Sequence, residues 1–350
     1  MFGIRPTPEG EKLLQLGVGV ALFLAVVGGL LIVVDRGPDL VAWIGRKLRG
    51  GKDPVRRKPA REFWGAMAFL LPAGLLLTVG LLVPMGRTTV LSLRDRFDDE
   101  WVGLENYIWM FTQGDILIVL RNTLIWVIVA PFLVTAIGLI YAVLVDRAKF
   151  EWFAKSLIFM PMAISFVGAS IIWKFVYEVR PEGSDQIGLL NQVVVWLGGT
   201  PRNWLVMRTG ALNTLLLIVI LVWIYVGFAM VVLSAAIKAI PMDIIEAARM
   251  DGTNAWQMFW KVTLPSIRPA VIVVVVTVSI ATLKLFDIVR TMTGGNFGTS
   301  VIANEMYTQA LGSAQQPGRG SALAVVLFLF VLPIALYQIR ELRRRREEVR

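Results

Sequence analysis

Residues 240–269 read IPMDIIEAARMDGTNAWQMFWKVTLPSIRP, and they separate two long apolar segments of the chain. Pro241 suits the first turn of a helix, where its missing N–H leaves no hydrogen bond unmade. Asp243 and Glu246 would lie near the N-terminal end of that helix, where the helix dipole favours negative charge. Gly252 can adopt the left-handed conformation that commonly ends a helix. The stretch therefore predicts a short polar helix closed by a tight glycine turn.

A second helix is expected directly after this turn. Thr253 or Asn254 can cap its N-terminus, and Leu264-Pro265 is expected to stop it, because proline interrupts helical hydrogen bonding. A loop of this length with such regular helix signals is unusual as a mere connection. We therefore interpret residues 240–268 as a functional element that another protein contacts. Its apolar anchors would be Met250, Trp256, Met258 and Phe259.

The apolar segments on either side of this loop indicate a membrane protein. The chain of 350 residues is 56% hydrophobic and has a mean hydropathy of +0.68, which exceeds what soluble domains show. A helix needs about 20 apolar residues to cross a bilayer. We therefore predict an all-α, polytopic membrane protein with about seven transmembrane helices. The candidate spans are Leu13–Val34, Phe63–Pro84, Ile116–Val145, Phe153–Tyr177, Ala211–Ile237, Pro269–Val289 and Ser321–Ile339.

Lysine and arginine set the predicted orientation, because loops on the cytoplasmic side carry an excess of both. In a seven-span threading, the loops on one side hold 22 of them and the loops on the other side hold 11. The C-terminus is therefore predicted to be cytoplasmic, and the N-terminus comes out outside. The loops on the basic side are 35–62, 146–155, 238–268 and 340–350.

The chain contains no cysteine and no histidine. These absences exclude disulfide frameworks, thiolate metal sites and catalytic triads with an imidazole base. The net charge of +10 fits the basic inner loops of a membrane protein better than nucleic-acid binding. The segment Gly50-Gly51-Lys52-Asp53 lacks the spacing and the hydroxyl residue of a phosphate loop. We expect no catalytic site and no metal site, and this chain cannot hydrolyse ATP alone.

One short pattern occurs twice. Asn122-Thr123-Leu124 opens the third predicted span, and Asn213-Thr214-Leu215 opens the fifth. Asn and Thr suit a helix start near the membrane interface. We interpret the repeat first as helix capping, and only second as a trace of internal pseudo-symmetry.

The loop resembles a known family at fixed spacing. Glu246-Ala247-Ala248, then three residues, Gly252, nine residues, Val262, one residue and Leu264-Pro265 is similar to the EAA motif of binding-protein-dependent ABC importer permeases. Val262 departs from the isoleucine that this family prefers. The resemblance implies that the loop is a coupling helix that docks on an ATPase subunit. The residues it assigns to ATPase coupling are Glu246, Ala247, Ala248, Asp251, Gly252, Leu264 and Pro265.

The resemblance extends over residues 63–340 and narrows to the carbohydrate permeases, in particular the larger maltose permease subunit. It implies a six-helix permease core at 63–340 with the coupling loop at 240–268. Residues 1–62 would form an extra N-terminal helix with a basic cytoplasmic linker, and 341–350 a basic cytoplasmic tail. The stretches that carry the resemblance outside the loop are 102–107, 160–165, 283–287 and 292–295. Asn296-Phe297 departs from the Gly-Pro that family members often carry there.

A solute path would need polar or aromatic side chains that face inward. Aromatic rings suit the apolar faces of sugars, but the same side chains could instead pack against neighbouring helices. Charged groups inside a span usually face a cavity or a partner. Lys284 and Asp287, three residues apart, would share a helix face and could form a structural ion pair instead. The path candidates are Trp223, Tyr225, Phe228, Thr282, Lys284 and Asp287.

The resemblance also implies an assembly in a prokaryotic cytoplasmic (inner) membrane. It would contain a second permease subunit, expected to be a different chain, two ATPase subunits that bind ATP and Mg, and an extracytoplasmic solute-binding protein. This chain itself would bind no cofactor. The expected function is import of a sugar, such as a maltose-, trehalose- or α-glucoside-like solute, by alternating access. The alternatives are an ion-coupled secondary transporter and an ABC importer for glycerol-phosphate or a polyol.

Overall fold

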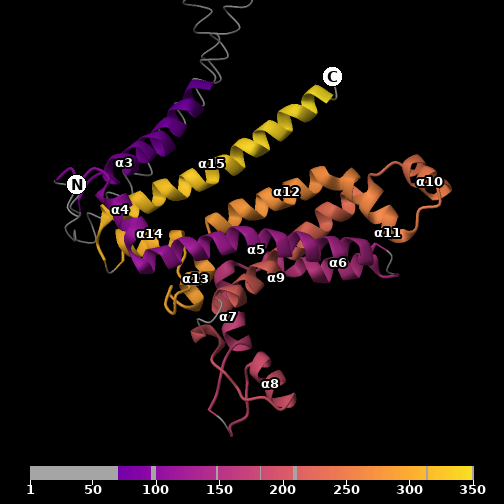
Figure 1. Cartoon of the computed structure of the whole chain (residues 1–350), viewed down its shortest axis with the longest axis horizontal. Helices are drawn as coiled ribbons and strands as arrows, with labels where there is room; N and C mark the ends of the chain where they lie inside the picture. Colours follow the sequence, from indigo (N-terminus) through magenta and orange to yellow (C-terminus); the bar gives the residue numbers. More distant parts are fainter. Residues whose placement is uncertain are drawn as a thin grey trace, which may run out of the picture. The chain divides into compact units, whose positions relative to one another are not determined.

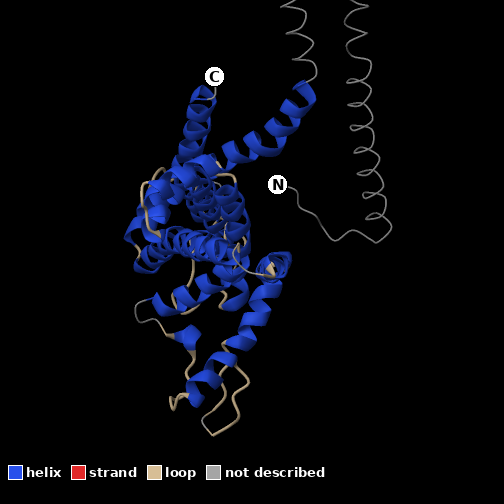
Figure 2. Ribbon diagram, turned by 90° about the vertical axis from the view of Figure 1, so that its right-hand side faces the viewer, coloured by secondary structure: helices blue, strands red, loops and turns tan. Residues whose placement is uncertain are grey.

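The computed structural model describes residues 70–95, 100–146, 149–181, 183–207, 211–312 and 314–348. These residues form helices and loops without a β-strand, apart from one isolated bridge between Arg94 and Trp101 (Figure 2). The chain divides into two compact units, Met1–Arg87 and Thr88–Arg350. The first predicted span, Leu13–Val34, and the basic linker after it lie outside the described residues.

Long apolar helices dominate the described chain, as predicted. Five are long and apolar enough to cross a membrane, and a bent helix pair raises the number to as many as six. The seven predicted spans are therefore not all seen in this part of the chain. The five helices are Leu70–Leu91, which contains the π-helix η1 (Thr78–Leu82) and α3 (Val83–Leu91), then α5 (Gly114–Val145), α9 (Leu212–Lys238), Ala255–Leu283 and Pro317–Gln338, the apolar part of α15 (Pro317–Glu348).

Helices α5 and α9 pack along each other and form the centre of the larger unit (Figure 1). Their contact is close because Gly138 has no side chain. A Cβ atom at Gly138 would lie 2.5 Å from the Cβ atom of Ala229 on α9. Small residues at such contacts let two membrane helices approach each other. Fully buried side chains such as Trp126 and Leu217 fill the surrounding core.

The fourth predicted span, Phe153–Tyr177, is two helices instead of one. Helix α6 (Glu151–Phe159) continues into the 3-10 helix η2 (Met160–Ala163), and α7 (Phe166–Val176) leaves at a bend of 103°. Pro161, which cannot donate a backbone hydrogen bond, lies inside η2. The Ser165 hydroxyl then accepts a hydrogen bond from the Gly168 N–H at 3.1 Å and caps the new helix.

The sixth predicted span, Pro269–Val289, also has different ends in the structure. Helix α12 (Leu264–Leu283) starts before Pro269, and it follows directly on α11 (Ala255–Gln257) and the π-helix η5 (Met258–Thr263). It ends at Leu283, and the short helix α13 (Asp287–Met292) begins after three residues. The prediction of a helix that continues to Val289 was therefore wrong.

Shorter helices complete the larger unit. The helices α4 and α14 pack with α15 around a second apolar cluster that includes Met110 and Leu323. The helix α8 and the 3-10 helix η3 lie in the connection between α7 and α9, and α10 follows α9 directly. Their bounds are α4 Glu105–Thr112, α8 Leu189–Trp196, η3 Trp204–Val206, α10 Met242–Met250 and α14 Ile302–Ala310.

Candidate functional site

The predicted polar helix is α10 (Met242–Met250), and it begins directly after Pro241. Its backbone closes as predicted, because Gly252 takes a left-handed φ of +75°. The Gly252 N–H donates to the Arg249 carbonyl at 3.0 Å. The Glu246 side chain is exposed, and Met250 at the end of the helix is 87% exposed. The helix therefore offers an acidic group and an apolar anchor on a surface of the larger unit.

The sequence left open whether Thr253 or Asn254 caps the second helix, and the structure gives each residue a separate role. Asn254 caps the second helix: its side-chain oxygen accepts from the Gln257 N–H at 2.8 Å, and the Gln257 side chain accepts from the Asn254 N–H at 3.1 Å. This reciprocal pair is a capping box. The Thr253 hydroxyl instead donates to the Ala248 carbonyl at 2.7 Å and closes the preceding helix.

The predicted stop at Leu264-Pro265 is wrong. One helical segment runs from Ala255 to Leu283, and Pro265 lies in the first turn of α12. The wide turns of η5 precede it, and the Leu264 N–H donates to the Phe259 carbonyl, five residues back. A π-turn changes the hydrogen-bond register, so the missing N–H of the proline does not break the segment. The loop is therefore joined to its span by continuous helix.

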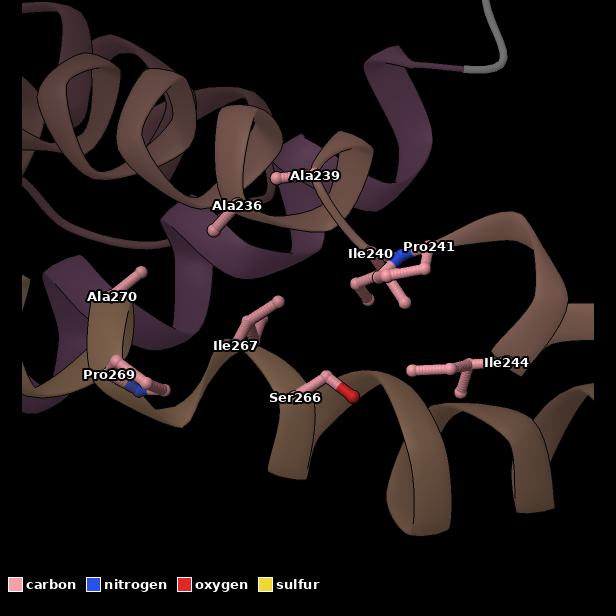
Figure 3. Close-up of a pocket in the computed structure, with 9 residues that line it drawn as sticks. All are labelled: Ala236, Ala239, Ile240, Pro241, Ile244, Ser266, Ile267, Pro269 and Ala270. Carbon is pink, nitrogen blue, oxygen red and sulfur yellow. The ribbon is translucent and has the colours of Figure 1, made fainter. Parts of the chain in front are cut away.

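A small cavity of about 270 Å³ lies where the loop leaves α9 (Figure 3). Ala236 and Ala239 come from the end of α9, Pro241 and Ile244 from the start of α10, and Ile267 from α12. The remaining lining residues are Ile240, Ser266, Pro269 and Ala270. The lining is mostly apolar. This cavity could not be predicted from local sequence signals, because its walls come from three separate segments.

A charged cluster ties three helix ends together beside this loop. The Lys155 ammonium group lies 2.7 Å from Asp146 Oδ1, at the end of α5, and 2.8 Å from Glu151 Oε1 on α6. It also donates to the Ser234 hydroxyl at 2.5 Å, and Ser234 donates to Asp146 Oδ1 at 2.7 Å. Lys238, the last residue of α9, pairs with Glu151. In the sequence these charges indicate only the orientation of the chain, and their separation along it gives no signal that they meet.

The aromatic path candidates of α9 lie against α7. The Trp223 ring packs edge-on against Trp173 at 6.0 Å between ring centroids. The Tyr225 ring stacks on Phe166 at 6.1 Å and meets Phe228 edge-on at 6.4 Å. All three candidates are partly buried against the main apolar core. The structure therefore brings Tyr225 and Phe228 together, whereas Trp223 packs against a different ring of α7.

The other path candidates lie where α12 breaks. Thr282 is 3% exposed, and its hydroxyl donates to the Ser279 carbonyl at 2.8 Å. Lys284 is exposed just after the end of α12, whereas Asp287 is half-buried at the start of α13. The prediction that Lys284 and Asp287 share a helix face is wrong, because the helix stops between them. Among the salt bridges of the described residues, none joins these two side chains.

Comparison with known proteins shows what this fold is similar to. The family described as binding-protein-dependent transport system inner membrane component matches residues 131–348. A chain from the crystal structure of a bacterial ABC transporter involved in alginate import has the same fold. Its TM-score is 0.67 at 22% identity, and the match covers 82% of this chain and 98% of that one.

Two curated relatives are much more similar in sequence. The osmoprotective compounds uptake permease protein GgtC of Synechocystis sp. is 49% identical over 275 residues, which cover 79% of this chain and 98% of the relative. The alpha-glucoside transport system permease protein AglF of Rhizobium meliloti is 48% identical over 276 residues, which cover 79% and 82%.

Proposed function

The chain belongs to the family of binding-protein-dependent transport system inner membrane components, and we propose that it is the permease subunit of an ABC importer for an α-glucoside-like sugar. The observation that carries this proposal is the exposed helix α10, which a tight turn at Gly252 connects to the continuous helical segment Ala255–Leu283. A partner that moves α10 would therefore also move the span.

The docking partner is proposed to be an ATPase subunit. Glu246 and Met250 are exposed on α10, and the turn at Gly252 fixes where the next helix starts. The small side chains of Ala247 and Ala248 let another protein approach the helix closely. Asp251, Leu264 and Pro265 would hold this loop in place. ATP and Mg would bind to the ATPase pair, whose closure would drive alternating access.

The rest of the assembly follows from the same proposal. A second permease subunit of different sequence and a solute-binding protein on the outer side would complete the importer. Residues 1–62 would add an N-terminal membrane helix with a basic linker, and 341–350 a basic tail on the cytoplasmic side. The solute path would pass Trp223, Tyr225, Phe228, Thr282, Lys284 and Asp287, which lie on α9, on α12, in the break after α12 and at the start of α13.

Co-purification tests this proposal directly. The tagged chain is expected to bring down an ATPase subunit and a second permease from membranes of its host. Glu246→Lys should lose the ATPase because it places a positive charge on the docking face. Asp185→Lys makes the same charge change at an exposed site between α7 and α9, and it should retain the partner. Transport by the chain alone in vesicles without ATP would refute the proposal in favour of an ion-coupled transporter.

The relatives support a second solute class. GgtC, named for osmoprotective compounds, is as similar to this chain as AglF is. Uptake of labelled trehalose by reconstituted vesicles, in competition with maltose or with a polyol, separates the two classes. Competition by maltose alone supports the α-glucoside class. Competition by the polyol alone supports the second solute class, which the polyol represents.

A further inference from the structure

The repeated Asn-Thr pattern has a role beyond helix capping. Asn122 lies eight residues after Gly114, the first residue of α5, and α9 is capped by Ala211 rather than by Asn213. The capping interpretation is therefore wrong for both asparagines. Each of them is almost fully buried, at 0% and 1% exposed. Their side-chain amides reach across to one loop that follows α13, residues 293–300.

Both asparagines hold the backbone of this loop. The Asn122 amide donates to the Gly298 carbonyl at 2.6 Å and to the Ser300 carbonyl at 3.0 Å. The Asn213 amide donates to the Phe297 carbonyl at 2.8 Å. These are contacts between residues far apart in sequence, so they fix the loop against α5 and α9 at the same time.

The loop that Asn122 and Asn213 hold has an unusual backbone. Gly294, Gly295 and Gly298 have φ values between 66° and 86°, which glycine adopts readily. Phe297 has a φ of 56°, a left-handed conformation that is strained for an aromatic residue. Strained residues persist only where the surrounding structure determines them. The hydrogen bond from Asn213 to the Phe297 carbonyl supplies that restraint.

The backbone of Phe297 is held by this arrangement, and its ring is presented from a fixed point of the chain. It is 38% exposed, although its own carbonyl is bonded to a buried side chain. A glycine would adopt the same backbone without strain, so the local structure gives no reason for a phenylalanine here. Aromatic side chains, phenylalanine among them, are enriched in protein–protein interfaces.

The polar groups near the ring favour a protein over a sugar as its partner. The hydroxyls of Thr293 and Thr299 bond each other at 2.6 Å, and the Asn296 amide donates to the Thr293 carbonyl at 2.9 Å. A sugar site needs several converging polar groups to bond the sugar hydroxyls. In this loop the polar groups already bond one another, so mainly the apolar ring of Phe297 remains available to a partner.

The position of the loop in the fold indicates which protein would contact Phe297. Asn122 and Asn213 lie toward the first residues of α5 and α9, whereas the charged cluster lies at the opposite ends of these helices and α10 follows α9. If α10 faces the cytoplasm, as the proposed function requires, the loop faces the outside. The soluble protein on that side of the proposed importer is the solute-binding protein.

We propose that Phe297 is a docking contact for the extracytoplasmic solute-binding protein, and that Asn122 and Asn213 are the residues that position it. This proposal rests on the proposed function. The probe is the solute-binding protein recovered by cross-linking to the wild-type complex. Its concentration is titrated against the ATPase activity of the complete complex in lipid vesicles.

Phe297→Gly is the decisive variant, because glycine keeps the left-handed backbone and removes only the ring. The half-maximal concentration of binding protein should rise about tenfold, with unchanged maximal ATPase activity and a thermal stability that is equal or higher. Phe297→Tyr should behave as wild type. Asn213→Leu should raise the half-maximal concentration and also lower the stability. Phe111→Ala removes an exposed ring from α4 and should leave the half-maximal concentration unchanged.

The alternatives give different results. An unchanged half-maximal concentration in Phe297→Gly would overturn the docking contact and leave the proposed function standing. If this variant loses the second permease subunit on purification, the ring lies in a subunit interface instead. If the solute range changes while the half-maximal concentration does not, the ring lies in the solute path. Either result overturns the proposal. If no binding protein cross-links to the wild-type complex or stimulates it, the proposed function itself fails.

Discussion

Lys155 and Asp146 lie on different helical segments, and their charged groups meet at 2.7 Å. Ser234 of α9 bridges them, because its hydroxyl accepts from Lys155 and donates to Asp146. Ser234 is 2% exposed. The ends of α5, α6 and α9 are thus joined by a partly buried polar network directly before the loop that carries α10.

Ser234→Ala should destabilise the protein. It removes a buried hydroxyl that bonds two charged groups, which costs about 1–3 kcal/mol. Denaturant unfolding of the purified complex measures the change. Ser266→Ala is the matched control, since the exposed Ser266 hydroxyl bonds only the Val262 carbonyl of its own helical segment. Equal stability of both variants would show that the network contributes little.

Gly252→Ala should weaken the coupling of ATPase activity to transport. The site has free space around a Cβ atom, but its φ of +75° is strained for alanine, which costs about 1–2 kcal/mol. Gly252→Asn should retain more activity, because asparagine tolerates this conformation better. The ratio of solute transported to ATP hydrolysed in vesicles is the measurement. If alanine and asparagine give the same ratio, backbone strain is not the cause.

Asn254→Ala should loosen the second helix of the loop. It removes the accepting side chain of the capping box with Gln257, a loss of about 1 kcal/mol. Hydrogen exchange of the Gln257 amide should become faster in the complex. Asn254→Asp keeps a side-chain acceptor and should retain protection. Unchanged exchange in the alanine variant would mean that packing alone orders this turn.

Gly138→Ala should disturb the contact of α5 with α9. The new methyl group would lie 2.5 Å from the Ala229 Cβ atom, and overpacking of this kind costs about 1–3 kcal/mol. Adding Ala229→Gly should restore part of the stability, as measured by thermal unfolding. Gly114→Ala, which has free space around it, should be neutral. Failure of the second substitution to rescue the first would locate the strain elsewhere.

Tyr225→Phe separates a solute contact from packing. The phenylalanine ring keeps the stacking on Phe166 but loses the hydroxyl that could bond a sugar. Lower uptake in vesicles, with normal assembly of the complex, is expected if Tyr225 lines the path. Normal uptake by Tyr225→Phe together with poor assembly of Tyr225→Ala would assign the residue to packing.

Local signals in the loop predicted local structure well. Pro241 and Gly252 mark the start and the end of α10 because each restricts or permits particular backbone angles. The same reasoning failed at Pro265, where the π-helix η5 lets the helix continue. It also failed at Lys284, because an apolar run does not show where α12 ends. Helix ends there depend on packing rather than on propensity.

Asn122 and Asn213 show a different limit of prediction from sequence. Their repeat was visible in the sequence, but capping was the nearest local explanation. Their hydrogen bonds join Asn122 to a carbonyl 176 positions away and Asn213 to one 84 positions away. A single sequence gives no signal for pairings at such separations, so the loop they hold could not be foreseen.

The sequence by itself determined the membrane-spanning class of this protein, its main apolar helices and the loop that carries α10. These properties follow from the distribution of apolar residues and from glycine and proline, whose effects act over a few positions. Only the tertiary structure decided where the fourth span bends, which charges meet at Ser234 and what holds Phe297. These features depend on which helices lie next to each other, because hydrogen bonds and side-chain packing form between segments that the chain brings together only on folding.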